Sequence, residues 1–236
     1  MSWLTDKKGL EEQYATDANL RARQALWTEK EGDDAKEILW RTLEAWQPKR
    51  VLEVGGGQGE LAERMQRELG AEVTFLDLSA GMVELARARG LDARVGDVQE
   101  LPFADGSFDT VVAAWMLYHV PDIDRALSEL GRVLKDGGAL IAVTNSGRHI
   151  EELRELLAYD RSGLDMTFSS ENGEELLGRY FATVARFDAV VRAIVRDRDV
   201  LVAYRNSIPA TTAQVPDDVE LPFVVHGRTT IFVATT

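Results

Sequence analysis

The chain has 236 residues, of which 45% are hydrophobic and 28% charged, with a net charge of −13 and a pI of about 4.8. This length and composition fit a globular protein with one large α/β domain or two small ones. The absence of cysteine excludes disulfides and thiolate metal sites. The acidic balance disfavours a nucleic-acid substrate, although a net charge can hide a local basic patch.

No apolar run approaches the roughly 18 residues that a membrane helix needs, and residues 1–10 lack the apolar core of a signal peptide. We therefore expect a cytoplasmic protein with no membrane segment. The chain shows no internal repeat, low-complexity tract or clear domain linker.

The first elements in chain order are two expected helices, over residues 21–27 and 35–46. Apolar side chains recur there at helical spacing, among them Leu20, Trp27 and Leu43. Pro48 ends the second helix. We expect residues 1–47 to form an N-terminal helical arm and residues 48–236 to form the single main domain.

From residue 50 the pattern alternates strands with helices, which predicts a mostly parallel sheet covered by helices on both faces. The expected strands are 50–54, 72–76, 92–95, 110–114 and 139–144. The expected helices are a segment after Gly59 that closes at Gly70, then 81–89 and 122–134, with a turn at 136–138.

The tail is less regular. Its expected helices are 150–159, 169–179 and 197–207, and its expected strands are 184–195 and 229–234. Asn172 and Glu175 have the spacing of a weak capping box. The loop 209–222 holds three of the six prolines and is expected to be exposed.

The most informative segment is the glycine loop Gly55–Gly59, which has four glycines in five positions between an apolar strand and a helix. Such a backbone can lie directly against a ligand, and the helix behind it points free N–H groups toward that ligand. Ligands of open α/β sheets bind beyond the carboxyl ends of the strands. That rule gathers the loop, Asp77, Asp97 and Trp115 around one crevice.

The loop alone does not identify the cofactor. It fits a relaxed dinucleotide fingerprint, and Asp77 can hold the ribose of either NAD or S-adenosylmethionine. Glu53, just before the glycines, is badly placed beside a pyrophosphate because like charges repel at close range. A carboxylate there suits an amine-bearing ligand. After the third strand, the Asp97 carboxylate and the Val98 N–H can read an adenine edge.

Residues 50–144 resemble the class I S-adenosylmethionine-dependent methyltransferases. The resemblance rests on Leu-Glu-Val-Gly-Gly-Gly-Gln-Gly at 52–59, on Asp77-Leu-Ser, and on Gly96-Asp97 followed by Leu-Pro-Phe and Phe-Asp109. It also rests on Met116-Leu-Tyr-His-Val120 and on Leu130-Gly-Arg-Val-Leu-Lys-Asp-Gly-Gly138. It implies a three-layer, Rossmann-like, seven-stranded sheet with the last strand antiparallel. It also implies S-adenosylmethionine as cofactor and S-adenosylhomocysteine as product.

The resemblance also implies roles for individual residues. Gly55, Gly57 and Gly59 would face the methionine part and the ribose. The remaining expected cofactor contacts are Asp77 at the ribose diol, Leu78 and Met82 against the adenine, Asp97 and Val98 at the adenine edge, and Ala114 or Trp115 near the sulfonium. The sequence departs from the common pattern at Gly56 and Gln58. Neither change removes a required glycine, and Gln58 could add a side-chain hydrogen bond.

The arm segment from Tyr14 through Asn19-Leu-Arg-Ala-Arg23 resembles that of a bacterial subgroup with many small-molecule enzymes. There an arginine meets the cofactor carboxylate, which a guanidinium fork suits well. Arg23 matches better than Arg21. The alternative is a solvated helix arginine.

Methyl transfer needs proximity and alignment above all, so a dedicated base is not required. His119, just after the fourth strand, is the first candidate base, with a structural or positioning role as the alternative. His149 is the second candidate, and His226 is left unplaced. Tyr14, Trp115 and Tyr118 could wall the substrate pocket or pack elsewhere. No cluster of Asp, Asn and His indicates a metal.

The sequence thus predicts a methyltransferase that acts on an O or N atom of a small molecule. One alternative is an RNA or protein methyltransferase, which would need a basic or peptide-shaped groove. Another is a protein that binds S-adenosylmethionine without transferring its methyl group. An NAD-dependent oxidoreductase fits least, because of Glu53 and the Asp97 segment. The oligomeric state stays open.

Overall fold

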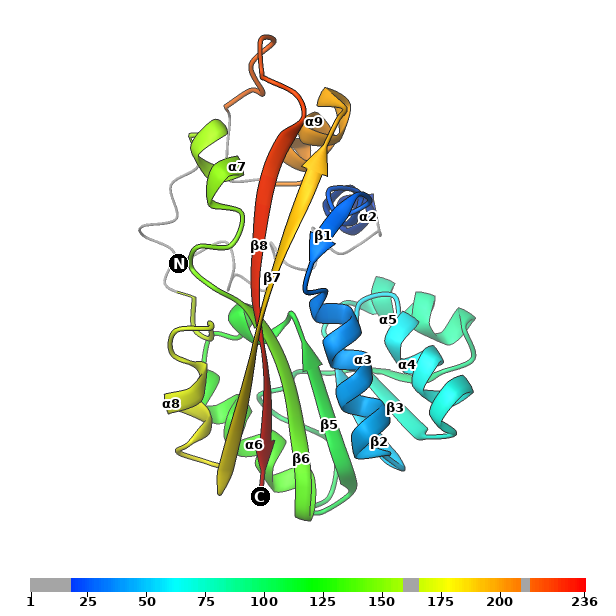
Figure 1. Ribbon diagram of the computed structural model, residues 1–236. Helices are drawn as coiled ribbons and strands as arrows, with labels where there is room; N and C mark the ends of the chain where they lie inside the picture. Colours follow the sequence, from blue (N-terminus) through cyan, green and yellow to red (C-terminus); the bar gives the residue numbers. More distant parts are fainter. Residues whose placement is uncertain (1–17, 159–165, 209–212) are drawn as a thin grey trace.

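The structure, a computed structural model, describes residues 18–158, 166–208 and 213–236. Within them, eight strands form one sheet in the order β1-β7-β8-β6-β5-β2-β3-β4 (Figure 1). The strands are β1 Lys30–Gly32, β2 Arg50–Val54, β3 Glu72–Asp77, β4 Asp92–Val95, β5 Phe108–Ala114, β6 Leu134–Asn145, β7 Thr183–Val195 and β8 Phe223–Thr235. The helices are α2 Ala18–Ala25, α3 Ala35–Trp46, α4 Glu60–Arg64, α5 Ala80–Ala88, α6 Ile123–Val133, α7 Glu151–Leu156, α8 Gly173–Leu177 and α9 Arg198–Asn206.

Strands β4, β3, β2, β5 and β6 run parallel, so their carboxyl ends meet at one edge of the sheet. Strand β8 is antiparallel to both of its neighbours, as expected for the last strand. The sheet differs from the expected seven strands by β1, which pairs antiparallel with β7. All three residues of β1 are exposed, so it has no apolar pattern that could predict it.

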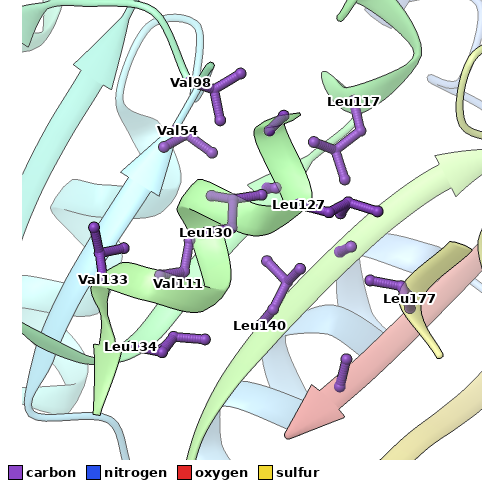
Figure 2. Packing of buried hydrophobic residues seen from close by; sticks show 14 of the residues in the cluster. Val54, Val98, Val111, Leu117, Leu127, Leu130, Val133, Leu134, Leu140 and Leu177 are labelled. Atoms are coloured by element: carbon purple, nitrogen blue, oxygen red, sulfur yellow. The ribbon is translucent and has the colours of Figure 1, made fainter. Parts of the chain in front are cut away.

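Helices cover both faces of the sheet, as the alternating pattern predicts. On one face, Leu127, Leu130 and Val133 of α6 pack over Val111 of β5 and Leu140 of β6 (Figure 2). The other face is covered by α3, α4, the π-helical turn Met65–Leu69 that continues α4, and α5. Their core side chains include Leu39, Leu43, Met65 and Val83. The result is the three-layer, Rossmann-like arrangement.

A third apolar cluster lies where β7 and β8 extend past the parallel strands toward α7 and α9 (Figure 1). It contains Leu26 from the arm, only 1% exposed, together with Ile150, Leu153, Leu201 and Val225. The arm is therefore packed into the main body. The division at residue 48 stays a prediction.

Two expected boundaries were wrong. The turn at 136–138 is a bulge inside the long strand β6, whose pairing with β5 shifts register between Phe108–Leu134 and Thr110–Ala139. Gly137 has φ +72°, which a glycine adopts without strain. Strand β8 begins before residue 229 because it pairs with β7 along its whole length, although His226 and Gly227 interrupt its apolar pattern.

The expected capping box at Asn172 was also wrong. Asn172 precedes α8, but its Oδ1 accepts a hydrogen bond from the Ser169 N–H (2.6 Å) and makes no cap bond to the helix. The side chain closes the preceding turn instead, which is the competing local use of an asparagine. Among the described residues, no helix combines the length and apolarity needed to cross a membrane.

Candidate cofactor and acceptor site

A cavity of about 590 Å³ lies at the carboxyl edge of the parallel strands and continues beneath the arm. Of the residues expected from the sequence, it is lined by Arg23, Glu53, Gly55, Gly57, Asp77, Leu78, Met82, Asp97, Val98, Ala114, Trp115, Tyr118, His119 and His149. Gln58 and Gly59 do not line it. The structure therefore brings together residues that are far apart in the sequence. Tyr14 lies outside the described residues.

The glycines of the loop have different tasks. Gly57 has φ +59°, and a Cβ added there would meet only the tip of Leu20 at 3.5 Å, so its open side faces the cavity. Gly59 has φ +76°, but its Cβ would lie 2.6 Å from Leu91 Cδ1 and 3.2 Å from Ala86 Cβ. Gly59 thus permits close packing of α4 rather than contact with a ligand, contrary to the role expected for it.

Glu53 lies beneath the loop and is 1% exposed. Gly56 is required above it, because a Cβ there would be 2.5 Å from Glu53 Cδ and 2.6 Å from Phe75 Cε2. Burial raises the pKa of Glu53 to about 8. The hydrogen bond from the Ala62 N–H lowers this pKa, and the nearby charge of Asp77 raises it further. Its Oε2 is buried and has no hydrogen-bond partner in the part of the chain that the structure describes. Such an oxygen suits a cationic amine.

Asp77 ends β3 and lies beside the loop. Its Oδ1 accepts a hydrogen bond from the Ser79 N–H at 2.8 Å. Burial raises the pKa of Asp77 to about 6, and the N–H groups of Ser79, Gly57 and Leu78 act in the opposite direction. Ser79 also caps α5, which places Met82 on the same wall of the cavity.

The next wall follows β4. The Gly96 N–H donates to Asp77 O at 3.0 Å, and a Cβ on Gly96 would meet Leu76 Cδ1 at 2.7 Å, so the loop needs glycine to approach β3. Asp97 Oδ1 accepts from the Gln99 N–H at 3.0 Å. The following Val98 is 5% exposed. These contacts hold Asp97 and Val98 where the sequence places an adenine edge.

Beyond β5, Trp115 has φ +56°, an uncommon conformation for a bulky residue that is frequent at functional sites. Its N–H donates to Val143 O at 2.8 Å, which anchors the strained residue to β6. His119 ends a short 3₁₀ turn, Leu117–His119, and its ring lies 4.5 Å from that of Tyr118. These aromatic rings share one wall of the cavity.

His149 is held against β8. Its Nδ1 lies 3.0 Å from the Arg228 N and 3.2 Å from the Arg228 carbonyl oxygen, so whether Nδ1 donates or accepts depends on the ring tautomer. A proton-accepting role of His149 stays a prediction. His226 contacts Glu152 and does not line the cavity.

Arg23 faces the cavity, whereas Arg21 does not. Arg23 Nη2 donates to Ser207 O at 2.7 Å, and its Nε lies 3.3 Å from Ser207 Oγ. Arg23 thus joins α2 to the end of α9. Contact between Arg23 and a cofactor carboxylate stays a prediction.

Sequence reasoning missed most of the cavity beneath the arm. The lining residues not expected there include Trp27, Lys30, Lys36, Asn145, Ile150, Met166, Val191, Tyr204, Ile208 and Thr229. Asn145 could have been found, because it follows the expected fifth strand at the same carboxyl edge as Asp77. The others come from the arm and tail, where no motif marks them. Among the described residues, no group of three or more His, Cys, Asp or Glu side chains is placed to hold a metal.

Comparisons with known proteins agree with this geometry. Residues 52–142 match the family described as "Methyltransferase domain". Residues 52–142 therefore belong to the class I S-adenosylmethionine-dependent methyltransferases. The cofactor of this methyltransferase domain is S-adenosylmethionine. The orphaned Glu53 oxygen and the open Gly57 cradle fit its amino-acid part.

Methyltransferase GfsG of Streptomyces halstedii is 38% identical over 117 residues, which are 46% of this chain and 42% of that protein. A demethylmenaquinone methyltransferase of Thermobifida fusca is 35% identical over 136 residues, 52% of this chain and 57% of that protein. The chain thus spans about half the length of these curated relatives. The YcgJ protein of Bacillus subtilis shares the fold, with a TM-score of 0.61 at 18% identity over 85% of this chain and 98% of that one.

Proposed function

We propose that the protein transfers the methyl group of S-adenosylmethionine to an O or N atom of a small molecule. The observation that carries this proposal is the continuity of the cavity. One space joins the glycine loop and Asp77 to a chamber walled by Trp27, Ile150 and Tyr204. A cofactor and an acceptor can therefore meet without leaving the molecule.

We assign the parts of the cofactor to residues from the charges of the side chains and from where a ligand can come close to the backbone. Glu53 receives the α-amino group, Asp77 the ribose hydroxyls, and Asp97 with Val98 the adenine edge. Gly57 leaves room for the methionine tail, and Gly55, whose Cβ side is filled by Met116, lines the same cavity. Gln58 and Gly59 act by shaping the loop and its helix rather than by touching the ligand.

The bound cofactor supplies an electrophilic methyl group, which an acceptor atom takes by in-line displacement. The protein's part is to align the two molecules and exclude water. Trp115, fixed in its strained conformation, lines this continuous space and would lie near the sulfonium. His119, which lines the cavity, is the base that this proposal assigns to accept a proton from the acceptor. The apolar chamber favours a small organic molecule over a nucleic acid, in keeping with relatives named for quinone methylation.

The test is product formation from a panel of small phenols, quinols and amines incubated with the full chain and S-adenosylmethionine. We expect acceptor-dependent release of S-adenosylhomocysteine together with a methylated product, both detected by mass spectrometry. Tight binding of S-adenosylhomocysteine with no turnover on any acceptor class would instead favour a cofactor-binding protein that does not transfer the methyl group.

A further inference from the structure

The chamber beneath the arm has apolar walls on several sides. Trp27, Ile150, Tyr204 and Ile208 all line it, and all belong to or pack against the third apolar cluster. Trp27 is held tightly, because its ring fills the space where a Cβ on Gly227 would come within 2.7 Å. The walls are therefore preformed and suit an apolar molecule.

One corner of this chamber is polar. Asn145 at the end of β6 lies directly opposite Thr229 of β8 in the antiparallel ladder. Thr229 Oγ1 donates to Asn145 Oδ1 at 3.1 Å, and the Asn145 carbonyl accepts the Ser170 N–H at 3.1 Å. Both the backbone and the amide of Asn145 are thus fixed in orientation.

The fixed amide of Asn145 leaves a donor for a ligand. With Oδ1 occupied by Thr229, its Nδ2 carries two N–H groups, and no hydrogen bond of Nδ2 is found within the described segments. His149 lines the cavity too. The corner therefore offers N–H donors, and neither Asn145 nor Thr229 carries a charge.

The position of the corner suits an acceptor rather than the cofactor. Asn145 ends β6, which lies two places from β2, the strand that carries the glycine loop, in the order β2-β5-β6. At the usual strand spacing this is about 10 Å. An N–H pair at that distance from the loop would bind a molecule that lies beyond the cofactor.

We propose that Asn145, oriented by Thr229, binds a carbonyl oxygen of an uncharged, apolar acceptor. This inference rests on the proposed function and deepens it by naming the acceptor class. A carbonyl oxygen only accepts hydrogen bonds, so it matches a corner of donors. A site built to hydrogen-bond such an oxygen discriminates against a ligand that lacks it.

The test compares two probes of the same skeleton, 1-tetralone, which carries one carbonyl, and tetralin, which has none. Binding to the full chain saturated with S-adenosylhomocysteine is followed by tryptophan fluorescence. We expect 1-tetralone to bind at least fivefold more tightly than tetralin. In Asn145→Asp, which keeps the oxygen that Thr229 contacts but replaces the N–H donors, this preference should disappear.

Controls separate this inference from folding and from the proposed function. Thr229→Val removes the bond that orients the amide and should reduce the preference, whereas Asn206→Ala, on the exposed side of α9, should leave it intact. All variants should bind S-adenosylhomocysteine within twofold of the native chain. An unchanged preference in both cavity variants, or no binding of either probe, overturns the inference. Failure of the native chain to bind S-adenosylhomocysteine overturns the proposed function instead.

Discussion

The two ends of the cavity are built in different ways. At the cofactor end, each wall lies at or directly after the carboxyl end of a parallel strand, from Glu53 and the glycine loop to Asp77 and Asp97. At the acceptor end, the walls come from the arm, the end of β6, α9 and β8, with Trp27 and Thr229 about 200 residues apart in the chain. The first end is encoded by local motifs and the second by tertiary packing. Each end can therefore be altered separately.

The largest effect on stability is expected when two glycines of the same loop, Gly59 and Gly57, are each replaced by alanine. Gly59→Ala adds a Cβ against Leu91 at a backbone angle unfavourable for alanine, so we expect a loss of about 2–5 kcal/mol in unfolding free energy. Gly57→Ala meets only Leu20 and should cost about 1 kcal/mol. Thermal unfolding measures both. Calorimetry then measures how far each variant loses affinity for S-adenosylhomocysteine. Relative to its loss of stability, Gly57→Ala should lose more affinity than Gly59→Ala. The same ratio of affinity loss to stability loss in both variants would contradict the separate roles of the two glycines.

Glu53 should lower the free energy of unfolding at neutral pH although it contributes to cofactor binding. Its folded pKa of about 8 lies above the ordinary value of 4.5, so the folded chain keeps a proton that the unfolded chain releases between these pH values. The stability contributed by this proton is complete below about pH 4.5 and is lost as the pH rises through 8. Glu53→Gln should therefore gain stability relative to the native chain between pH 5 and 8.5, on the order of 3 kcal/mol.

Cofactor binding supplies the control for Glu53. Glu53→Gln should weaken the binding of S-adenosylhomocysteine about tenfold, or roughly 1.4 kcal/mol. The affinity for 5′-methylthioadenosine, which lacks the amino-acid part, should not change. A stability difference that does not depend on pH, or equal losses for both ligands, would show that Glu53 has another role.

Asp77→Asn tests the ribose contact. The variant keeps the backbone hydrogen bond from Ser79 but removes the charge, so we expect S-adenosylhomocysteine affinity to fall by about 1–3 kcal/mol. Asp92→Asn is the matched control, because Asp92 is exposed at the start of β4 and pairs with Arg94. Unchanged affinity in Asp77→Asn, measured by calorimetry, would mean that the ribose binds elsewhere.

The smallest effect is expected at Arg23, which stands between the two ends. Arg23→Gln loses its bonds to Ser207 and should lower the unfolding free energy by about 1 kcal/mol. If the Arg23 guanidinium reaches the cofactor carboxylate, Arg23→Gln lowers the affinity for S-adenosylhomocysteine about fivefold and leaves that for 5′-methylthioadenosine unchanged. Arg21→Gln, outside the cavity, serves as the control. An equal change for both ligands would limit Arg23 to joining α2 and α9.

The extent to which the sequence predicted this molecule follows the same division. Asp77, Asp97 and the parallel strands were predicted because a strand, its end and the next polar residue are neighbours in the chain. Gly59 was assigned to the cofactor because the glycine loop resembles that of the methyltransferases, whereas its contacts with Leu91 and Ala86 arise from tertiary packing that the motif does not show. Strand β1 was missed since Lys-Glu-Gly is held by pairing with β7 and by the Glu31–Arg192 ion pair, not by apolar residues. Asn145 and Thr229 meet only because two antiparallel strands bring them into register.

The central claim is that the glycine loop, Glu53 and Asp77 form a site for an adenosine that carries an amino acid. Isothermal titration of the full chain with S-adenosylhomocysteine and, separately, with NAD tests it most directly. The account predicts one site for S-adenosylhomocysteine and no measurable binding of NAD at the same concentrations. Saturable binding of NAD without binding of S-adenosylhomocysteine would contradict it.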